Sequence, residues 1–256
     1  TGLELGTFAQ VLSWKLGSKH MADMITGGMD LHSVTAAKML DLSYDDFRER
    51  LKAGDEKCKD ARQLCKAPNF GYPGGMSAKT LVKFARAQGA TVSVAKAVEL
   101  KKNWSRTFPE GPAYLRWINH LENKKTERYD FMIPGSPGIF RAGATYCSAA
   151  NGHFQGLGAQ VMKQAGWEIM LESWTDPTSP LYGIGMVLFI HDEFIFEIPV
   201  GKQHAVMVRA REVLLRVLHR MLPDVNLDAD MVAMAYWSKD AKMMYNKNGE
   251  LEIWNG

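Results

Sequence analysis

Three residues at every fourth position offer groups that suit a nucleoside triphosphate. Arg62, Lys66 and Phe70 follow this spacing, and residues four apart on a helix lie on nearly the same face. The stripe would present two cations to phosphates and a flat ring to a sugar and base. Taken alone, however, the pattern is more typical of an ordinary basic surface helix.

A second group, His191-Asp192-Glu193, lies between the apolar runs 186–190 and 194–198. This arrangement predicts a buried β-hairpin with carboxylates at its tip, although such a tripeptide is often only a polar turn. Carboxylates at the end of buried strands need a compensating charge, and a divalent metal ion would supply it. Because successive strand side chains point to opposite faces, we expect Asp192 to be the principal ligand and Glu193 a secondary one. The stripe and the hairpin together indicate phosphoryl or nucleotidyl transfer.

Asn151 and Gln155 form a third group, four residues apart on a long helix predicted at 141–173. Amide pairs on helices usually serve packing or contact solvent. They also suit the minor groove of a duplex, where every base pair presents acceptors. Arg141 lies ten residues before Asn151, and we expect it to reach a phosphate on the same side.

Charge is unevenly distributed along the chain. Residues 48–130 hold 18 Lys and Arg against 9 Asp and Glu, an excess of nine positive charges. Because the whole chain carries only +3, the remainder carries −6. A basic half joined to an acidic half suits a protein that grips a polyanion with one part and metal ions with the other. Lysines on solvated helix faces would give the same charge.

Composition excludes several classes of protein. The 256 residues are 46% hydrophobic, enough for one large domain or two smaller ones. No apolar run approaches the length of a membrane span. The N-terminus shows no signal peptide pattern, because Glu4 comes early and no basic region precedes an apolar one. Three cysteines without a CxxC pair predict reduced cytosolic thiols rather than a zinc site.

The elements that must position these groups follow from hydrophobic spacing and from turn residues. The chain is predicted to be α+β and helix-rich, with a small antiparallel sheet. Pro68 is awkward inside its helix, and the Pro- and Gly-rich segment 129–140 is the best internal boundary. Helices are expected at 4–24, 30–40, 43–54, 55–72, 77–88, 93–106, 110–123, 141–173 and 202–222, and strands at 184–190, 194–199 and 228–235.

The order of these motifs resembles the polymerase module of family A DNA polymerases, the bacterial DNA polymerase I class. The resemblance covers essentially the whole chain, and the segment 70–76 is most similar to the phage branch. It implies a partial right-hand fold with helix-rich fingers at 29–140 and palm segments at 1–28 and 141–256. The motifs are Gly2-Leu3-Glu4-Leu5, Asp30-Leu31-His32, Arg62/Lys66/Phe70-Gly71, Asn151/Gln155-Gly156, His191-Asp192-Glu193 and Trp237.

The resemblance also implies an activity and its partners. The chain would be a DNA-directed DNA polymerase that adds dNTPs to a primer 3′-hydroxyl by two-metal nucleotidyl transfer with Mg²⁺. Nothing suggests a membrane, and the expected location is the cytoplasm of a bacterial host. The implied dNTP-binding residues are Glu4, His32, Arg62, Lys66 and Phe70. Among them, Glu4 would exclude a ribose 2′-hydroxyl, and Lys66 would also be catalytic. The implied contacts to primer–template DNA are Arg141, Asn151, Gln155 and His191, and the implied catalytic metal ligands are Asp192 and Glu193.

The sequence departs from the family pattern in three ways. The second metal-binding aspartate of the family would stand two residues before Thr1, and the thumb precedes it. We therefore expect the chain alone to be nearly inactive and to need an N-terminal polypeptide that carries both. A split gene, protein splicing and truncation all remain open as origins. Gly6 replaces a common arginine, and Gly74 replaces the usual tyrosine.

Two rival functions remain. A single-subunit RNA polymerase of the phage or mitochondrial type shares the Arg/Lys helix and a His-Asp pair, but Glu4 and Glu193 favour the DNA enzyme. A catalytically inert subunit that binds primer–template DNA would also explain the basic segment. Such a subunit differs from a polymerase in one respect: a correct nucleotide with Mg²⁺ should not tighten its complex with DNA.

Overall fold

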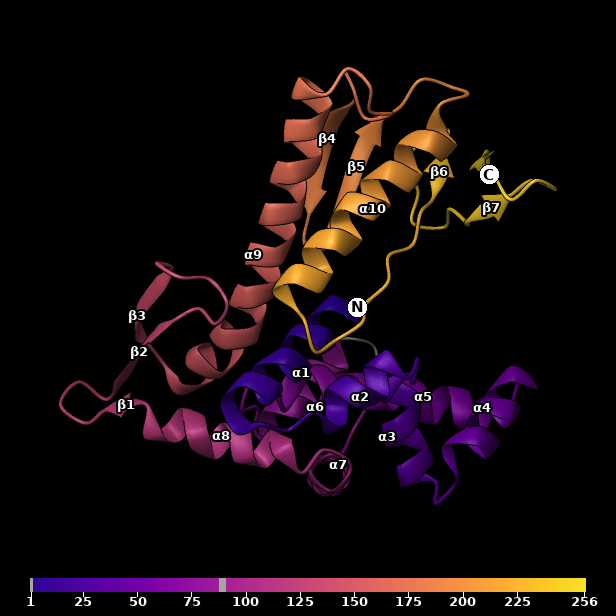
Figure 1. Ribbon diagram of the computed structural model, residues 1–256. Coiled ribbons are helices and arrows are strands. Elements are labelled where there is room, and N and C mark those ends of the chain that lie inside the picture. Colours follow the sequence, from indigo (N-terminus) through magenta and orange to yellow (C-terminus); the bar gives the residue numbers. More distant parts are fainter. Residues whose placement is uncertain (1, 88–90) are drawn as a thin grey trace. The chain divides into compact units, whose positions relative to one another are not determined.

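A computed structural model describes residues 2–87 and 91–256, which form ten helices and eight strands (Figure 1). The helices are α1 (Gly2–Leu16), α2 (His20–Thr26), α3 (Leu31–Met39), α4 (Tyr44–Lys52), α5 (Glu56–Gly71), α6 (Ala78–Ala87), α7 (Val94–Thr107), α8 (Glu110–His120), α9 (Tyr146–Thr175) and α10 (Gln203–Met221). The strands are β1 (Glu122–Asn123), β2 (Arg128–Met132), β3 (Phe140–Ala144), β4 (Gly185–Ile190), β5 (Glu193–Glu197), β6 (Ala233–Met234), β7 (Met244–Tyr245) and β8 (Leu251–Trp254). The predicted α+β class, helix-rich with small antiparallel sheets, is confirmed.

The chain divides into two compact units. Unit 1 contains the residues up to Gly158 together with Asp224–Asn226, and unit 2 contains Ala159–Pro223 and Leu227–Gly256. The division falls inside α9, which contributes to both units. The finger and palm boundaries expected at residues 28 and 140 are a different kind of division and stay a prediction.

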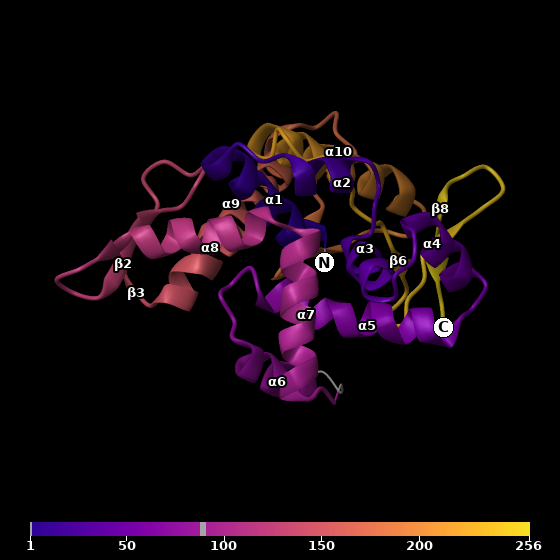
Figure 2. The same ribbon diagram turned by 90° about the horizontal axis from the view of Figure 1, so that it is seen from below.

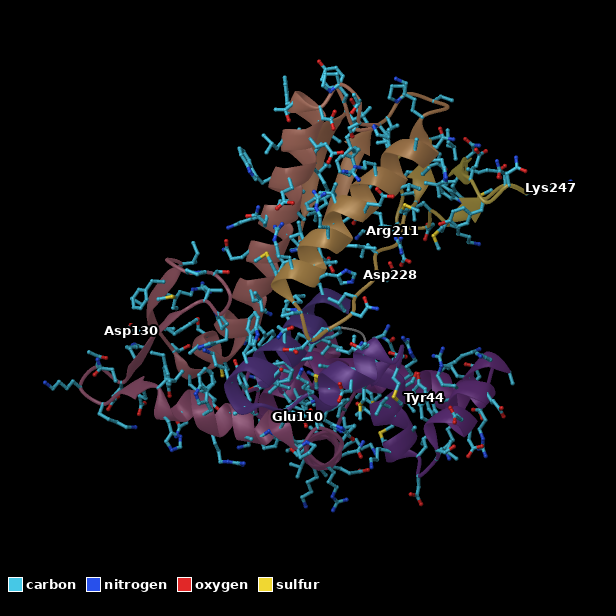
Figure 3. All side chains as sticks on the ribbon, in the orientation of Figure 1. Tyr44, Glu110, Asp130, Arg211, Asp228 and Lys247 are labelled. Carbon is cyan, nitrogen blue, oxygen red and sulfur yellow. The ribbon has the colours of Figure 1, made fainter. Side chains whose placement is uncertain are left out.

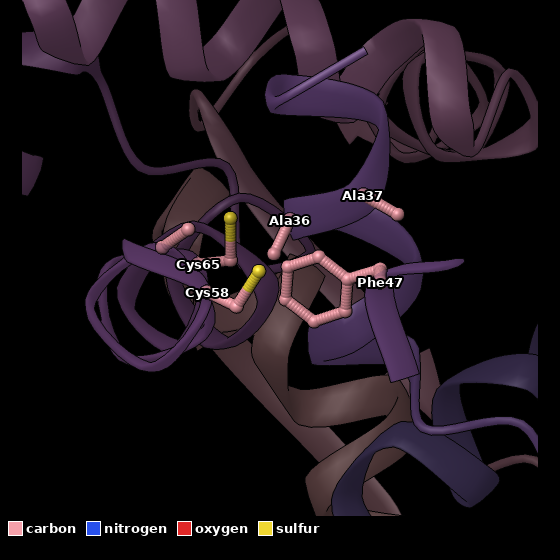
Figure 4. Close-up of a cluster of buried hydrophobic side chains, with 6 residues drawn as sticks. Ala36, Ala37, Phe47, Cys58 and Cys65 are labelled. Carbon is pink, nitrogen blue, oxygen red and sulfur yellow. The ribbon is translucent and has the colours of Figure 1, made fainter. Parts of the chain in front are cut away.

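Side-chain caps start three helices of unit 1. Asp30, Ser43 and Asp55 each accept a hydrogen bond from a backbone N–H in the first turn of α3, α4 and α5. Such caps satisfy N–H groups that have no partner inside the helix. The three helices then pack around Phe47, which is fully buried (Figure 4). The other buried members of this cluster are small, which lets the helices approach closely: Ala36, Ala37, Cys58, Ala61 and Cys65.

The C-terminal end of α5 is held against α7. The hydroxyl of Tyr72, the residue that follows α5, donates to the Ala97 carbonyl at 2.7 Å, and its ring lies 5.8 Å from that of Trp104. Figure 2 shows α6 beside one end of α7, with α5 crossing nearby. These buried contacts fix the end of the helix that carries the Arg62–Phe70 stripe.

A three-stranded antiparallel sheet, β1-β2-β3, packs on the start of α9 within unit 1. Phe131 of β2 stacks on His153 of α9 with ring centroids 4.1 Å apart. The ring lies so close to Gly152 that a Cβ there would stand 2.6 Å from it. Arg141 lies on β3, so its predicted place on the long helix is wrong. The bulged pairing of β2 with β3 extends the strand to Ala144, and the helix begins only at Tyr146.

Unit 2 contains the predicted hairpin. Strands β4 and β5 pair antiparallel, with Ile190 opposite Glu193, so His191 and Asp192 form the turn. One face packs on α9 and α10 through Phe194, Phe196 and Ile198 (Figure 1). The expectation that the two apolar strands bury the hairpin is wrong for β4, which leaves three large side chains 44–50% exposed: Val187, Leu188 and Phe189.

Ion pairs join α9 to α10 in unit 2. Arg209 binds Glu172 through its Nε at 2.7 Å, and Arg220 binds Glu168. Arg211 pairs with Asp228 (Figure 3). The strand predicted at 228–235 is reduced to β6, which pairs in parallel with β8, and β7 pairs with the other edge of β8.

Two predicted helices differ from those in the structure. The helix predicted at 4–24 is two helices, because Gly17 adopts a left-handed conformation with φ +67° and ends α1. The helix predicted at 77–88 ends at Ala87, and residue 88 lies outside the described residues. The three cysteines are free thiols. No helix in the described part of the chain combines the length and apolarity that crossing a membrane requires.

Asp224 binds three side chains from the N-terminal part of unit 1. Its carboxylate accepts from Lys19, from Gln10 and from Ser13, at 2.7, 2.7 and 2.8 Å. These hydrogen bonds lower the pKa of Asp224 to about 2. Asp224→Ala leaves the fully buried Gln10 amide without its acceptor, so we expect a loss of about 1–3 kcal/mol in the free energy of unfolding near neutral pH.

The sign of the pH dependence follows from the lowered pKa. The stabilisation is fully present above the ordinary value of 3.8 and is lost as the pH falls through it toward 2. Urea unfolding of both proteins, followed by circular dichroism from about pH 7 down to about pH 3, should show the two curves converging. A difference that stays constant over this range would contradict the assignment.

Candidate functional site

The predicted triphosphate-binding residues come together in unit 1. Arg62, Lys66 and Phe70 lie along α5, and His32 lies in the first turn of α3. The His32 and Phe70 rings meet edge to face with centroids 5.2 Å apart. Arg62 and Lys66 are close enough to His32 to act on its titration. The structure therefore places two cations, an imidazole and an aromatic ring in one neighbourhood.

Asp30 is the acceptor that joins α3 to α5. Its Oδ2 accepts from Arg62 Nε and from Ser33 Oγ, both at 2.6 Å, and its Oδ1 accepts from the His32 backbone N–H at 3.2 Å. Its own backbone N–H donates to the hydroxyl of Tyr44 at 3.0 Å (Figure 3 labels Tyr44). Burial, the largest single influence, would raise the pKa of Asp30, but the hydrogen bonds from Arg62 and Ser33 together with nearby positive charge hold the pKa below its usual value. Asp30 thus stays ionised and fixes Arg62.

His32 is almost fully buried, at 6% exposed, and its ring is held by Asn69. The Asn69 amide nitrogen lies 3.0 Å from His32 Nδ1 and 3.1 Å from the Leu31 carbonyl oxygen. Burial lowers the pKa of His32 to about 4, with Arg62 and Lys66 acting in the same direction and Asp30 against it. His32 is therefore a neutral imidazole at physiological pH.

Sequence reasoning placed Asp30 in a motif without giving it a role in this site, and it missed Asn69. Asp30 carried one usable signal, because an Asp directly before a helix is a common N-cap. Asn69 carried none, since its partners come from α3, more than thirty residues earlier in the chain.

Glu4 and Gln155 are also brought together in unit 1. Gln155 Nε2 of α9 donates to Glu4 Oε1 of α1 at 3.1 Å. Both side chains reach the surface, so the pair is available to a ligand as well as to each other. Arg141 Nη1 lies 3.7 Å from where a Cβ on Gly152 would stand, which places its guanidinium beside the start of α9.

Asn151 lies against the loop that follows α5. Its amide donates to the Cys147 carbonyl at 2.9 Å. A Cβ added at Gly74 would stand only 2.3 Å from Asn151 Nδ2 and 2.4 Å from Oδ1. The space next to Gly74 is therefore filled by Asn151, and no side chain fits at position 74 while Asn151 keeps this rotamer. This accounts physically for a glycine where the sequence comparison expected tyrosine.

The carboxylate hairpin belongs to unit 2. Asp192 is in its turn, beside His191 with φ 55°, and Glu193 begins β5; all three are exposed. Within residues 2–87 and 91–256 no three His, Cys, Asp or Glu side chains gather as a metal site would require. Mg²⁺ in phosphoryl-transfer sites is often bound by one or two carboxylates, with substrate phosphates and water completing its shell. Asp192 and Glu193 fit that part of a ligand set.

Comparisons with known proteins show which family the chain resembles. The family model for DNA polymerase family A matches residues 9–239. DNA polymerase I of Aquifex aeolicus is 27% identical over 223 residues, which cover 86% of this chain and 36% of that protein. DNA polymerase I of Deinococcus radiodurans is 28% identical over 215 residues, which cover 79% of this chain and 20% of that protein.

A solved structure shares the fold. It is the POL domain of Pol1 from M. smegmatis in complex with a DNA primer-template and dNTP, with a TM-score of 0.64 and 21% identity. The match covers 84% of this chain and 35% of that one. This chain therefore has a partial polymerase fold, and it spans about a third or less of the length of these relatives.

The contact between Gly74 and Asn151 can be tested by a double-mutant cycle. Gly74→Ala overpacks this contact, so we expect a loss of about 1–3 kcal/mol in the free energy of unfolding, measured by urea denaturation. In an Asn151→Ala background the added methyl has room, and Gly74→Ala should then cost much less. The matched control is Gly2→Ala, whose Cβ would meet nothing within 4 Å. Additive effects of the Gly74 and Asn151 changes would contradict direct contact.

Proposed function

This chain belongs to DNA polymerase family A, and we propose from that membership that it contributes to template-directed DNA synthesis. The reaction is addition of a deoxynucleotide to a primer 3′-hydroxyl with release of pyrophosphate. The observation that carries the proposal is the gathering of His32, Arg62, Lys66 and Phe70 on α3 and α5. These are the residue types that bind a triphosphate, a sugar and a base.

The nucleotide site would work mainly by positioning and charge. Arg62, fixed by Asp30, offers its remaining guanidinium N–H groups to phosphate oxygens, and Lys66 lies one helical turn further along the same face. Charge that develops on the leaving pyrophosphate is stabilised by these cations without reorganisation. Phe70 supplies an apolar surface for the sugar, and its contact with His32 fixes the ring.

Contacts to DNA are assigned to α9 and its neighbours. Asn151 and Gln155 lie on one face of α9 and offer amide groups to minor-groove acceptors. Arg141 on β3 offers a cation to a backbone phosphate, and His191 at the hairpin turn lies next to the carboxylate assigned to the metal. Glu4, already bound by Gln155, is held where it excludes a ribose 2′-hydroxyl.

Asp192 and Glu193 are proposed to hold Mg²⁺. Two Mg²⁺ ions held there would supply acidification of the primer 3′-hydroxyl and neutralisation of charge on the leaving group. The task of this chain is to hold the carboxylates on a rigid hairpin, and the packing of Phe194 and Phe196 on α9 and α10 does so.

Because the chain spans about a third of its relatives, we propose that activity requires the part of the polymerase module that precedes it in the family. That part would supply the thumb and the other metal-binding aspartate, on the same or on a separate polypeptide. The test is primer extension with dNTPs and Mg²⁺ by this chain alone and with that part added. Robust extension by the chain alone would refute the requirement.

The Asp192 assignment gives a direct prediction for the assembled enzyme. Asp192→Ala should reduce the rate of nucleotide addition at least about a hundredfold, because metal ligands are lost. Its affinity for primer–template DNA should change little, because the Asp192 carboxylate is negatively charged and does not attract the DNA phosphates. The control is Glu197→Ala, which removes a carboxylate at the opposite end of the same hairpin. Undiminished extension by Asp192→Ala would show that the metal assignment is wrong.

Phe70→Tyr tests the sugar contact. A hydroxyl at the ring edge adds a polar group where the 3′ side of the sugar is expected to lie. We therefore expect altered discrimination between deoxy- and dideoxynucleotides, measured as the ratio of kcat/KM for the two. The control is Phe84→Tyr on α6, which makes the same change away from the stripe and should leave the ratio unchanged. An unchanged ratio for Phe70→Tyr would show that the Phe70 ring does not contact the sugar.

A further inference from the structure

A buried chain of hydrogen bonds runs from the backbone of α3 to the ring of His32. The Asn69 amide nitrogen donates to the Leu31 carbonyl oxygen at 3.1 Å and reaches His32 Nδ1 at 3.0 Å. The amide oxygen faces the Thr35 hydroxyl at 3.1 Å, and that hydroxyl also lies 2.9 Å from the Leu31 carbonyl oxygen. Asn69 is 1% exposed, so water does not compete for these bonds.

The orientation of the Asn69 amide follows from its partners. A backbone carbonyl oxygen only accepts hydrogen bonds, so the group facing Leu31 must be the NH₂ and not the oxygen. The same NH₂ group faces His32 Nδ1, which must therefore be the unprotonated nitrogen of the ring. A neutral imidazole with a bare Nδ1 carries its proton on Nε2.

We propose that Asn69 is a positioning residue that fixes His32 as a neutral Nε2–H donor to the triphosphate of the incoming nucleotide. The proposal rests on the proposed function, because it assumes that α3 and α5 bind a triphosphate. It adds the reason why a buried histidine serves there: its proton is placed on one nitrogen by a fixed amide and not by the ligand.

The surroundings of His32 favour a neutral donor over a third cation. In the described part of the chain, the charged groups that face it are Asp30 at the start of its own helix and Arg62 and Lys66 on α5. Asp30 favours a charged ring, but its carboxylate is already shared with Arg62 and with the α3 N-terminus. In addition, a proton on Nδ1 would point at the Asn69 NH₂ group, which has nothing to accept it with.

In the described part of the chain, His32 forms no hydrogen bond through Nε2. Nε2 is also not one of the buried polar atoms that lack a partner, which are Glu110 Oε2 and Ser136 Oγ. The Nε2–H group therefore remains for a ligand. An N–H donor to a phosphate oxygen is a charge-assisted hydrogen bond even when the donor is neutral. His32 would thus keep this bond throughout the neutral pH range.

The first test is spectroscopic and needs no activity. Nitrogen-15 NMR of the histidine-labelled chain, with His32→Gln to assign the signal, reports directly which ring nitrogen carries the proton. We expect His32 to show the Nε2–H form, unchanged from about pH 8 to about pH 6. A proton on Nδ1, or a charged ring in this range, would overturn the proposal whatever the Asn69 variants show.

The second test reverses the hydrogen bond. Asn69→Asp keeps the shape but replaces the NH₂ group with an acceptor, so His32 should move its proton to Nδ1 and its pKa should rise. With Nε2 bare, binding of inorganic tripolyphosphate, measured by calorimetry, should weaken at least about tenfold near pH 8, as expected for a lost hydrogen bond to a charged group. The deficit should shrink on acidification, because the protonated ring regains its Nε2–H.

The matched control is Asn103→Asp on α7. Asn103 is a neighbouring amide that donates to the Thr35 carbonyl at 3.0 Å but does not contact His32. It should disturb packing and add the same charge without changing the His32 tautomer or the pH dependence of binding. If both Asp variants weaken binding equally at every pH, Asn69 has only a structural role and the proposal fails. If the unmodified chain does not bind tripolyphosphate at all, the triphosphate site itself is refuted, whatever the tautomer.

Discussion

The Asp30 carboxylate is the constraint on which the candidate nucleotide site depends. It caps α3 through the His32 N–H, binds Ser33 and holds Arg62 of α5, all in hydrogen bonds of 2.6–3.2 Å. One anion therefore sets the start of one helix and the direction of a cation on another. Because its pKa is held below the usual value, this link persists at any physiological pH. Groups fixed before a ligand arrives lose little entropy when they bind it.

Local patterns in the sequence predicted the parts of the fold that local physics decides. The four-residue spacing of Arg62, Lys66 and Phe70 gave α5, and apolar runs around a polar tripeptide gave the β4–β5 hairpin. Helices α3 and α4 begin one residue after the starts predicted at 30 and 43. The break at Gly17 was missed because apolar spacing continues past it, whereas the backbone adopts φ +67° there.

The parts that failed depend on contacts distant in sequence. Arg141 precedes a helical pattern, but pairing of β3 with β2 draws it into a strand. The role of Asn69 depends on α3, and the glycine at position 74 depends on Asn151 of α9. In each case a partner decides the outcome, and one chain read alone does not identify that partner. The exposed face of β4 is similar, since apolar strands predict burial without saying what covers them.

In the proposed nucleotide site, a neutral histidine among cations would also affect release of the product. A further formal positive charge in a phosphate site would also strengthen binding of the pyrophosphate that leaves it, which would slow its release. Arg62 and Lys66 already supply two charges near His32. A neutral N–H donor adds direction without adding another full charge, so it orients the phosphates at a smaller cost to release. Burial, which keeps the pKa of His32 near 4, and Asn69, which fixes its proton, would then serve the same end.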